Sequence, residues 1–401
     1  MFKKIKELLG IDFFILCAMA CGFFISADYS IVRPVSNSLF IHFYGSEYLP
    51  YAWLIGLPFS FFAVSLYNRY LGKLGCAKMF AFTASFIVIV NLITALFVNQ
   101  AEWLSFFFYV WKEVYIMLMF QQLWSVIHST VNKEKAKFLY GLLFGFGALG
   151  GVFGSFIPGF FAVKLSSETL IFATLPIYLL LSISFALLLK HAKTVTFEKK
   201  GEFLQGVKLI ITSRALLFIL AIVVLMQFCS TLIDYQFQHG LQLSIPDKDL
   251  RTEYAGRLFS IIHGATLCLQ FLGTYLLIQI LGLRTSHFLV PFLLAASNMG
   301  YLLFPLFGMI SFSYILIKSF DFSFFVIVKE MLYIPMKSEE KFHAKAVIDV
   351  FAYRSAKALA SCLILFINPN FLTWANISLF VIWCIIVIKY FREKVPAYEK
   401  T

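Results

Sequence analysis

Residues 141–159 read GLLFGFGALGGVFGSFIPG, a stretch that contains no charged residue. A helix needs roughly 20 mainly apolar residues to cross the hydrocarbon core of a bilayer. The same pattern recurs on both sides of this stretch, and it predicts an all-α, polytopic membrane protein of about 12 transmembrane helices. The predicted spans are about 11–32, 48–68, 77–99, 103–128, 138–163, 167–189, 215–238, 258–281, 286–305, 309–334, 345–367 and 371–391.

The overall composition excludes a soluble globular protein. Of the 401 residues, 61% are hydrophobic, 13% are charged and 49 are Phe, which is more apolar surface than a soluble fold of this size can bury. A net charge of +12 would suggest a nucleic-acid partner in a soluble chain, but here the basic residues flank the apolar spans. We therefore expect a lipid bilayer, and no nucleic acid, around the protein.

The distribution of basic residues predicts the topology. If both termini are cytoplasmic, the segments on the inner side hold 23 of the 33 Lys and Arg residues, the excess that is typical of cytoplasmic loops. The basic start, Met1 to Lys6, leads into an apolar run that is too long for a signal peptide. We expect a multi-pass protein of a bacterial inner membrane with both termini in the cytoplasm.

A basic, polar segment, HAKTVTFEKKGEF from His191, divides the spans into two groups of six. It predicts an N-terminal half over 1–190, a cytoplasmic linker over 191–214 and a C-terminal half over 215–401. A weak internal repeat pairs WKEVYIM from Trp111, in the fourth span, with VKEMLYIPM from Val328, in the tenth. Two parallel six-helix halves are the layout of major-facilitator transporters, which bind their substrate near the bilayer midplane.

Charged residues inside the spans are candidates for a transport site, because a charge at the bilayer centre is costly without a partner or a wet cavity. For Lys112-Glu113 and Lys329-Glu330, structural ion pairs or snorkelling lysines are the alternative. The acids inside or near the spans are Asp28, Glu113, Asp234, Asp321, Glu330 and Asp349, and the bases inside the spans are Lys112, Lys318, Lys329, Arg354 and Lys357.

Two cations in the eleventh span, Arg354 and Lys357, share a helical face. Arg donates two hydrogen bonds to a phosphate from its planar fork, and Lys adds a mobile point charge, so the pair suggests an anionic substrate. The alternative is that both cations pair with Asp234 or Asp321 of neighbouring helices. We expect both arrangements to hold, in different transport states.

The glycines of the fifth span recur at four-residue spacing, which favours close helix packing. No GK[ST] sequence follows them, and none occurs elsewhere, so ATP hydrolysis is not the expected driving force. The spacings contain no catalytic triad, metal-ligand set or disulfide framework. We expect a protein that is not an enzyme and that uses no cofactor or metal.

Several motifs resemble the nucleotide transporter family of plastids and obligate intracellular bacteria, the ATP/ADP antiporters. The most specific is KEMLYIP from Lys329, followed by KAVIDV from Lys345 and then by Arg354 and Lys357. Two further stretches are similar to the family, AKFLYGLLFGFGA from Ala136 and YSIVR from Tyr29.

This resemblance implies a twelve-helix carrier that exchanges ATP for ADP, or related nucleotides, by alternating access without hydrolysing them. Family charges needed for transport map onto Glu113, Asp234, Lys329 and Lys357, and the family has a Lys-Asp pair where this chain has Ser36-Asn37. With the other cations expected to attract phosphate, the candidate substrate-binding residues are Arg33, Glu113, Asp234, Lys329, Arg354 and Lys357.

Two other functions remain open. A proton-coupled permease for a nucleoside, a nucleotide cofactor or phosphate would use protons as the coupling ion, with Asp28, Glu113 or Asp234 as the protonation site. A non-transporting membrane receptor is the third possibility, but the charges inside the spans and the lack of a long extramembrane segment argue against it.

Overall fold

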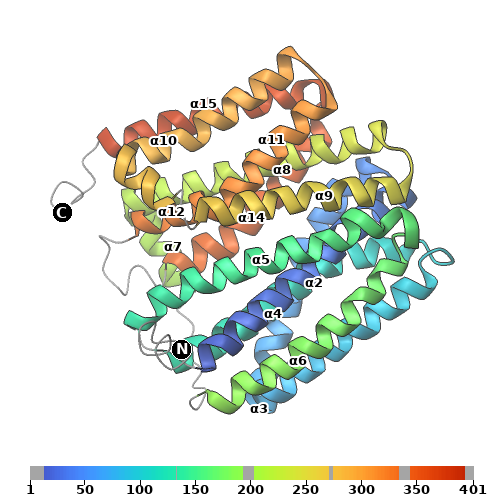
Figure 1. Ribbon diagram of the computed structural model, residues 1–401. Coiled ribbons are helices and arrows are strands. Elements are labelled where there is room, and N and C mark those ends of the chain that lie inside the picture. Colours follow the sequence, from blue (N-terminus) through green and yellow to red (C-terminus); the bar gives the residue numbers. More distant parts are fainter. Residues whose placement is uncertain (1–12, 132, 193–202, 271–273, 334–343, 393–401) are drawn as a thin grey trace. The chain divides into compact units, whose positions relative to one another are not determined.

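The computed structural model describes residues 13–131, 133–192, 203–270, 274–333 and 344–392, and these residues form helices and short connections without a strand (Figure 1). The longer helices are α2 (Phe13–Tyr44), α3 (Leu49–Phe97), α4 (Trp103–Thr130), α5 (Lys133–Leu165), α6 (Thr174–His191), α7 (Phe203–Thr212), α8 (Arg214–Ser244), α9 (Lys248–Cys268), α10 (Thr274–Leu303), α11 (Phe307–Phe320), α12 (Val326–Leu332), α14 (Tyr353–Phe366) and α15 (Leu372–Arg392). Short helical segments complete the chain: η1 (Ser46–Tyr48), η2 (Thr169–Ala173), η4 (Asp321–Phe325), η5 (Ala346–Ala352) and η6 (Pro369–Phe371).

Each of the twelve predicted spans coincides with helix over most of its described length, so the predicted all-α, multi-pass class is confirmed. By length and hydropathy, 8 helices among the described residues can cross a membrane, or 9 if the bent pair from Phe307 to Leu332 is one span. This number is smaller than twelve because Ser46–Phe97 is counted once, although it holds two predicted spans. In addition, α9 begins with a charged segment that lowers its hydropathy, and the eleventh predicted span is divided between η5 and the 14-residue helix α14.

Two glycines mark where consecutive spans meet. Gly75 interrupts α3 with φ 73° and ψ 167°, and Gly282 interrupts α10 with φ 73° and ψ 164°. This region of backbone space is accessible essentially to glycine alone. The two breaks separate the second span from the third and the eighth from the ninth, so they occupy corresponding places in the two predicted halves.

The predicted span ends are wrong at three helices. The first span was predicted to end at 32 and the seventh at 238, but α2 continues to Tyr44 and α8 to Ser244; α9 starts at Lys248 rather than 258. Polar residues at these ends resemble loops in the sequence, yet Arg33 is 9% exposed and Arg251 is 3% exposed. The helices continue because these polar residues are buried in packed structure, where an unpaired backbone group would be costly.

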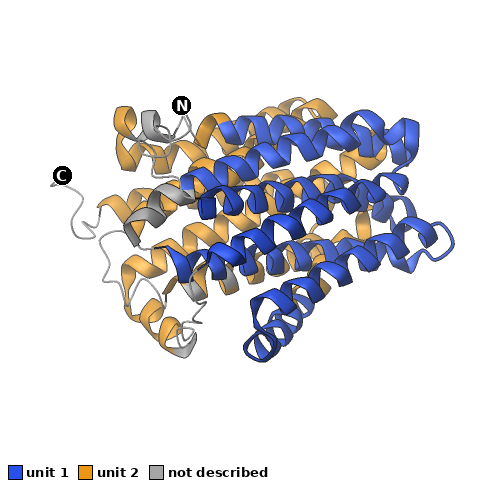
Figure 2. Cartoon of the chain, turned by 60° about the horizontal axis from the view of Figure 1, so that its bottom comes forward, with its two compact units in different colours: residues 1–45, 58–198, 245–267 blue, residues 46–57, 199–244, 268–401 orange. Residues whose placement is uncertain are grey.

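The chain forms two compact units, coloured separately in Figure 2. Unit 1 comprises 1–45, 58–198 and 245–267, and unit 2 comprises 46–57, 199–244 and 268–401. The predicted boundaries at 190 and 214 stay a prediction, and residues 193–202 of the predicted linker lie outside the described part of the chain.

In unit 1, α2 packs against α4, α5 and α6. The closest approach is to α5, which runs beside α2 (Figure 1) and meets it through glycines. A Cβ atom on Gly150 would lie 2.1 Å from the carbonyl oxygen of Phe23, and one on Gly154 would lie 2.2 Å from that of Ala27. The packing role predicted for the glycines of this span is therefore confirmed at Gly150 and Gly154, where any side chain would strike backbone.

In unit 2, α8 takes the place that α2 has in unit 1, because it packs against α11, α14 and α15. Two small residues of α14, Ala356 and Ala360, are 1% and 0% exposed. They follow the four-residue spacing that permits close helix approach. In both units the first predicted span of a half therefore packs on the fourth, fifth and sixth spans of that half.

Candidate functional site

In unit 1, Tyr29 of α2 contacts two of the predicted site residues. Its hydroxyl donates a hydrogen bond of 3.1 Å to Glu113 Oε1 on α4. The guanidinium carbon of Arg33 lies 5.7 Å from the centre of the Tyr29 ring and 4.4 Å from that of Phe259 on α9. Such contacts hold a guanidinium over an aromatic face. Arg33 and Glu113, both predicted from the sequence, are thus brought to one tyrosine.

Lys112, beside Glu113, is the most deeply buried lysine among the described residues, at 1% exposure. Its Nζ lies 3.5 Å from Glu113 Oε1 and 3.4 Å from the centre of the Tyr109 ring. Glu113 is 33% exposed. Lys112 therefore forms a structural ion pair with Glu113, which is the alternative given above for these two residues. The Glu113 carboxylate stays partly exposed.

Asp28, one turn before Arg33 on α2, has a different environment. Oδ2 accepts hydrogen bonds of 2.8 Å from the Tyr115 hydroxyl on α4 and 3.2 Å from the Tyr178 hydroxyl on α6. Oδ1 is buried and has no hydrogen-bond partner among the described residues. The side chain is 1% exposed. Asp28 is thus a buried carboxyl group held by two phenols.

In unit 2, Asp234 of α8 forms an ion pair with Lys318 of α11. Lys318 Nζ lies 3.2 Å from Asp234 Oδ2 and donates a hydrogen bond of 2.9 Å to the Ser230 hydroxyl. The Gln238 amide donates a bond of 3.4 Å to Asp234 Oδ1. Both charged side chains are about nine-tenths buried. Lys318 is identified from the sequence as a charge inside a span, but it is not among the predicted substrate-binding residues.

Arg354 and Lys357 are both half-buried on α14, in contrast to the buried Asp234 and Lys318. Lys357 Nζ lies 5.2 Å from the centre of the Trp53 ring, which belongs to the same unit. The residues are three positions apart, so they share a helix face as predicted. Their partial exposure leaves both cations accessible to a ligand.

The remaining predicted residue, Lys329, is part of a second charged cluster in unit 2. Lys329 Nζ donates a hydrogen bond of 2.8 Å to Asp349 Oδ1, and Lys345 Nζ lies 2.6 Å from Glu330 Oε2. Lys345 also lies 4.0 Å from Asp349 Oδ2. These contacts match the structural ion pair considered for Lys329-Glu330, although each residue pairs across helices rather than with its neighbour.

Two short π-helical segments, η4 and η5, interrupt the helices that carry these charges. Asp321 opens η4, and Asp349 lies within η5. Segments of π-helix inside longer helices are rare and occur frequently at functional sites. The bend of 42° between Phe307–Phe322 and Phe324–Leu332 coincides with η4. The charged part of unit 2 is therefore also its least regular part.

Ser36, at the position where the sequence resemblance leads us to expect a lysine, is fully buried, and its hydroxyl donates a hydrogen bond of 3.1 Å to the Arg33 carbonyl oxygen. Asn37 is 6% exposed. The two side chains lie within the packed part of α2. Of the cations expected to attract phosphate from this helix, Arg33 is the one that the sequence retains.

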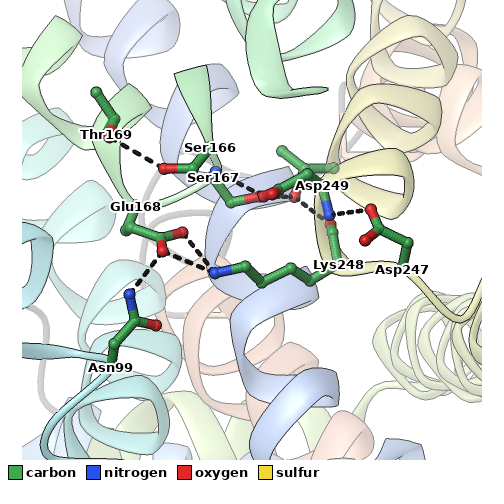
Figure 3. A network of polar contacts seen from close by, with 9 residues as sticks. Asn99, Ser166, Ser167, Glu168, Thr169, Asp247, Lys248 and Asp249 are labelled. Carbon is green, nitrogen blue, oxygen red and sulfur yellow. Dashed lines mark hydrogen bonds and ion pairs between the residues drawn. The ribbon is translucent and has the colours of Figure 1, made fainter. Parts of the chain in front are cut away.

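A polar network ties α9 to the connection between α5 and α6 in unit 1 (Figure 3). Lys248 Nζ lies 2.7 Å from Glu168 Oε1, and the same oxygen accepts a bond of 2.7 Å from the Asn99 amide. Asp249 Oδ1 accepts a bond of 2.7 Å from the Ser167 backbone amide. Sequence reasoning assigned no role to this network, because its members come from two connections and from the start of α9, which are far apart in the sequence.

Glu168 lies in the connection between α5 and η2, just before the candidate membrane span that begins at Thr169, and it has a shifted pKa. Burial acts to raise the pKa, but hydrogen bonds from Asn99 and Lys248 and the charge of Lys248 outweigh it, so the pKa lies below its ordinary value of 4.5. A depressed carboxyl pKa stabilises the folded state above the unfolded-state pKa, and this stability is lost as the pH falls through the folded-state pKa.

We expect Glu168→Gln to lower the melting temperature of the detergent-solubilised protein at pH 7, and this difference from the wild type to close as the pH falls below 4.5. Thermal unfolding, monitored by tryptophan fluorescence over a series of pH values, measures the melting temperature of each protein and the difference between them. Glu102→Gln, which removes an exposed carboxylate of α4's N-terminus, is the control. An equal difference between Glu168→Gln and wild type at every pH would contradict the role of this ion pair.

The described residues contain no group of three or more His, Cys, Asp or Glu side chains that could hold a metal ion. What the two units do contain is a set of intramembrane charges with two kinds of environment. Asp234 and Lys318 are buried and paired, whereas Arg354, Lys357 and Glu113 keep exposed edges. Chemically, the two partly exposed cations of unit 2, Arg354 and Lys357, can bind an anion.

Residues 303–392 match the family model TLC, described as TLC ATP/ADP transporter. The resemblance to the nucleotide transporter family is confirmed over this segment, which contains Lys318, Lys329, Arg354 and Lys357.

Solved structures of transporters share the fold. The POT family transporter PepTSo gives a TM-score of 0.68 at 9% identity, with 95% of this chain and 98% of that chain covered. The nucleoside transporter NupG gives 0.65 at 10% identity, with 95% and 100% covered. The xylose transporter XylE from E. coli gives 0.64 at 12% identity, with 96% and 98% covered. At these identities the likeness shows the major-facilitator fold alone, and together with the family match it makes the protein a multi-pass membrane transporter.

Proposed function

We propose that this membrane transporter, whose C-terminal segment resembles the ATP/ADP transporters, exchanges nucleotides such as ATP and ADP across a membrane by alternating access, without hydrolysis. The observation that carries the proposal is that the family match and the accessible cations lie in the same segment of the chain. The segment that matches the TLC family, 303–392, is also the segment with the accessible intramembrane cations.

The proposed substrate contacts follow from the chemistry of a nucleotide. A di- or triphosphate is a compact, multiply charged anion, so drawing it into a low-dielectric site requires several cations. Arg354 supplies a planar donor pair and Lys357 a mobile charge on the same helix face. Arg33, held over Phe259, supplies a further cation from unit 1. We assign phosphate binding to these three residues.

The acids have a different part in this proposal. In the empty carrier an unpaired cation inside the membrane is costly. Glu113 keeps an exposed edge and Asp234 is already paired with Lys318, so these carboxylates supply charge compensation when no nucleotide is bound. Lys329 belongs with this second group, because it is paired with Asp349. The host membrane is a bacterial inner membrane with both termini in the cytoplasm, in line with the distribution of basic residues.

We expect Lys357→Ala to lower the uptake of radiolabelled ATP or ADP by about 10- to 100-fold, since a hydrogen bond to a charged group contributes roughly 1.5–3 kcal/mol. Lys357→Arg should retain part of the uptake, because it keeps the charge. The measurement is initial uptake into proteoliposomes with equal amounts of inserted protein.

The matched control is Lys164→Ala, which removes an exposed lysine near the end of α5. Its uptake should equal that of the wild type. If Lys357→Ala were as active as Lys164→Ala, Lys357 would not contact the substrate, and the assignment of α14 as the phosphate-binding helix would fail.

A further inference from the structure

Three carboxyl groups inside the spans could take part in transport, and their environments differ in one respect. Glu113 lies 3.5 Å from Lys112 Nζ, and Asp234 lies 3.2 Å from Lys318 Nζ. A neighbouring cation keeps such a carboxylate charged. Asp28 forms no ion pair with a lysine, arginine or histidine in the part of the chain that the structure describes.

The packing around Asp28 separates it from water. On one side, Gly154 of α5 approaches the backbone of Ala27, the residue before Asp28, so closely that no side chain fits. On the other sides stand the Tyr115 and Tyr178 rings, which are 0% and 3% exposed. An ionised carboxylate in such a place costs several kcal/mol unless a cation compensates it. Binding a proton removes that cost without any rearrangement of neighbours.

The two phenol hydrogen bonds of Asp28 stabilise the ionised carboxylate, but they can also persist when the group is protonated. Both phenols donate to the same oxygen, Oδ2, whereas Oδ1 has no partner among the described residues. In a carboxylic acid the carbonyl oxygen accepts hydrogen bonds and the other oxygen carries the proton. With Oδ2 as the carbonyl oxygen, both phenol bonds persist, and Oδ1 is the atom that binds and releases the proton.

The charged and titratable groups around this site lie on four helices, α2, α4, α6 and α9. On α4, Glu113 forms an ion pair with Lys112 and also accepts a hydrogen bond from the Tyr29 hydroxyl. On α9, His263 reaches Ser30, two residues from Asp28, by a contact of 3.2 Å. The groups that face the site are therefore Tyr115, Glu113 and Lys112 on α4, Tyr178 on α6, Tyr29 and Arg33 on α2 itself, and His263 on α9.

We propose that Asp28 is a proton-binding site of the carrier, so that a proton crosses the membrane with the transported anion. The carboxylate takes one proton from the water on one side of the membrane and returns it to the other side; no bond to the cargo forms and no electron moves. The proton offsets one negative charge of the cargo. The inference rests on the proposed function for the identity of that cargo, but not for the existence of the site.

The first test uses proteoliposomes that enclose a pH-sensitive dye, with labelled ATP or ADP outside and the external pH varied. For the wild type, outside acid should stimulate uptake several-fold, and nucleotide should drive proton entry. For Asp28→Asn the ratio of uptake with and without the pH gradient should fall to about one. An undiminished ratio in Asp28→Asn would overturn the proposal.

Two further variants keep the test valid if Asp28→Asn fails to fold. Tyr115→Phe and Tyr178→Phe each remove one hydrogen bond to Asp28 and leave the carboxyl group in place. Each should shift the midpoint of the acid stimulation by about half to one pH unit. Tyr70→Phe, at an exposed phenol of α3, is the control and should leave the midpoint unchanged. Midpoints that equal the wild type in both phenol variants would overturn the proposal.

A measurement without transport separates this inference from the proposed function. Infrared spectra of the membrane-reconstituted protein should show a carboxylic-acid C=O band that appears and disappears as the pH is varied over the range of the transport assay. Asp28→Asn should lack this band; if it does not fold, Tyr115→Phe and Tyr178→Phe should shift the titration of the band. If the wild type moves no nucleotide but shows the band, the nucleotide proposal fails and the proton site stands. If the wild type transports but no band depends on Asp28, the proton site fails alone.

Discussion

Lys318→Met should destabilise the protein by about 3–5 kcal/mol, the cost of leaving a buried charge without its partner. Met has nearly the length of Lys, so the substitution removes the charge and leaves the packing of α11 nearly intact. Asp234 then keeps its contact with Gln238 and loses its ion pair with Lys318. The expected result is a large fall in melting temperature and in the yield of monodisperse protein, measured by thermal unfolding and size-exclusion chromatography in detergent.

A double-mutant cycle identifies the pair as the cause. Asp234→Asn combined with Lys318→Met removes both charges and should be more stable than either single variant, because no charge is left unpaired. Glu253→Gln serves as the control, since it breaks an ion pair with Arg257, a side chain that is 56% exposed, and exposed pairs contribute about 0–1 kcal/mol. Additive effects of the two single substitutions would show that Asp234 and Lys318 do not interact.

Gly150→Ala should be nearly as damaging, although it adds a single methyl group. The added Cβ atom would lie 2.1 Å from the Phe23 carbonyl oxygen and 2.9 Å from its Cα. These are backbone atoms, which cannot turn away as a flexible side chain can, so α2 and α5 must separate. Overpacking of this kind costs typically 1–3 kcal/mol, and occasionally more. Since α2 also packs on α4 and α6, the loss extends through unit 1.

The same helix provides the control. Gly141→Ala also replaces a glycine of α5, but no heavy atom lies within 4 Å of its added Cβ atom. In an exposed helix position Ala is the better helix former, so this variant should keep or raise the melting temperature. Equal melting temperatures for Gly150→Ala and Gly141→Ala would mean that the two helices do not meet at Gly150.

Much of the fold follows from the sequence because its determinants are local. Length and hydropathy identify the apolar spans, and twelve of them were placed on helices. Gly75 and Gly282 carry a further local signal, since both follow a leucine and precede a cation, Lys78 or Arg284, within three residues. The similar sequence around the two glycines can be seen without a structure. The backbone angles show that the two positions correspond, because both glycines adopt nearly the same conformation.

The pairing of charges could not be predicted, since it depends on how helices rotate against each other. Asp28 and Tyr178 are 150 positions apart, and no periodic pattern connects them. Lys318 was recognised as a charge inside a span, but the sequence does not show that it faces Asp234. The continuation of α2 through Arg33, Pro34 and Ser36 was missed for a related reason. A polar run resembles a loop unless its burial is known.

The central claim is nucleotide exchange, and the most direct measurement is uptake of labelled ATP or ADP into proteoliposomes with and without unlabelled nucleotide inside. The account predicts saturable uptake that depends on the preloaded nucleotide, is competed by both ATP and ADP, and leaves the γ-phosphate of ATP intact. A folded, reconstituted protein that takes up no nucleotide under either condition would contradict it.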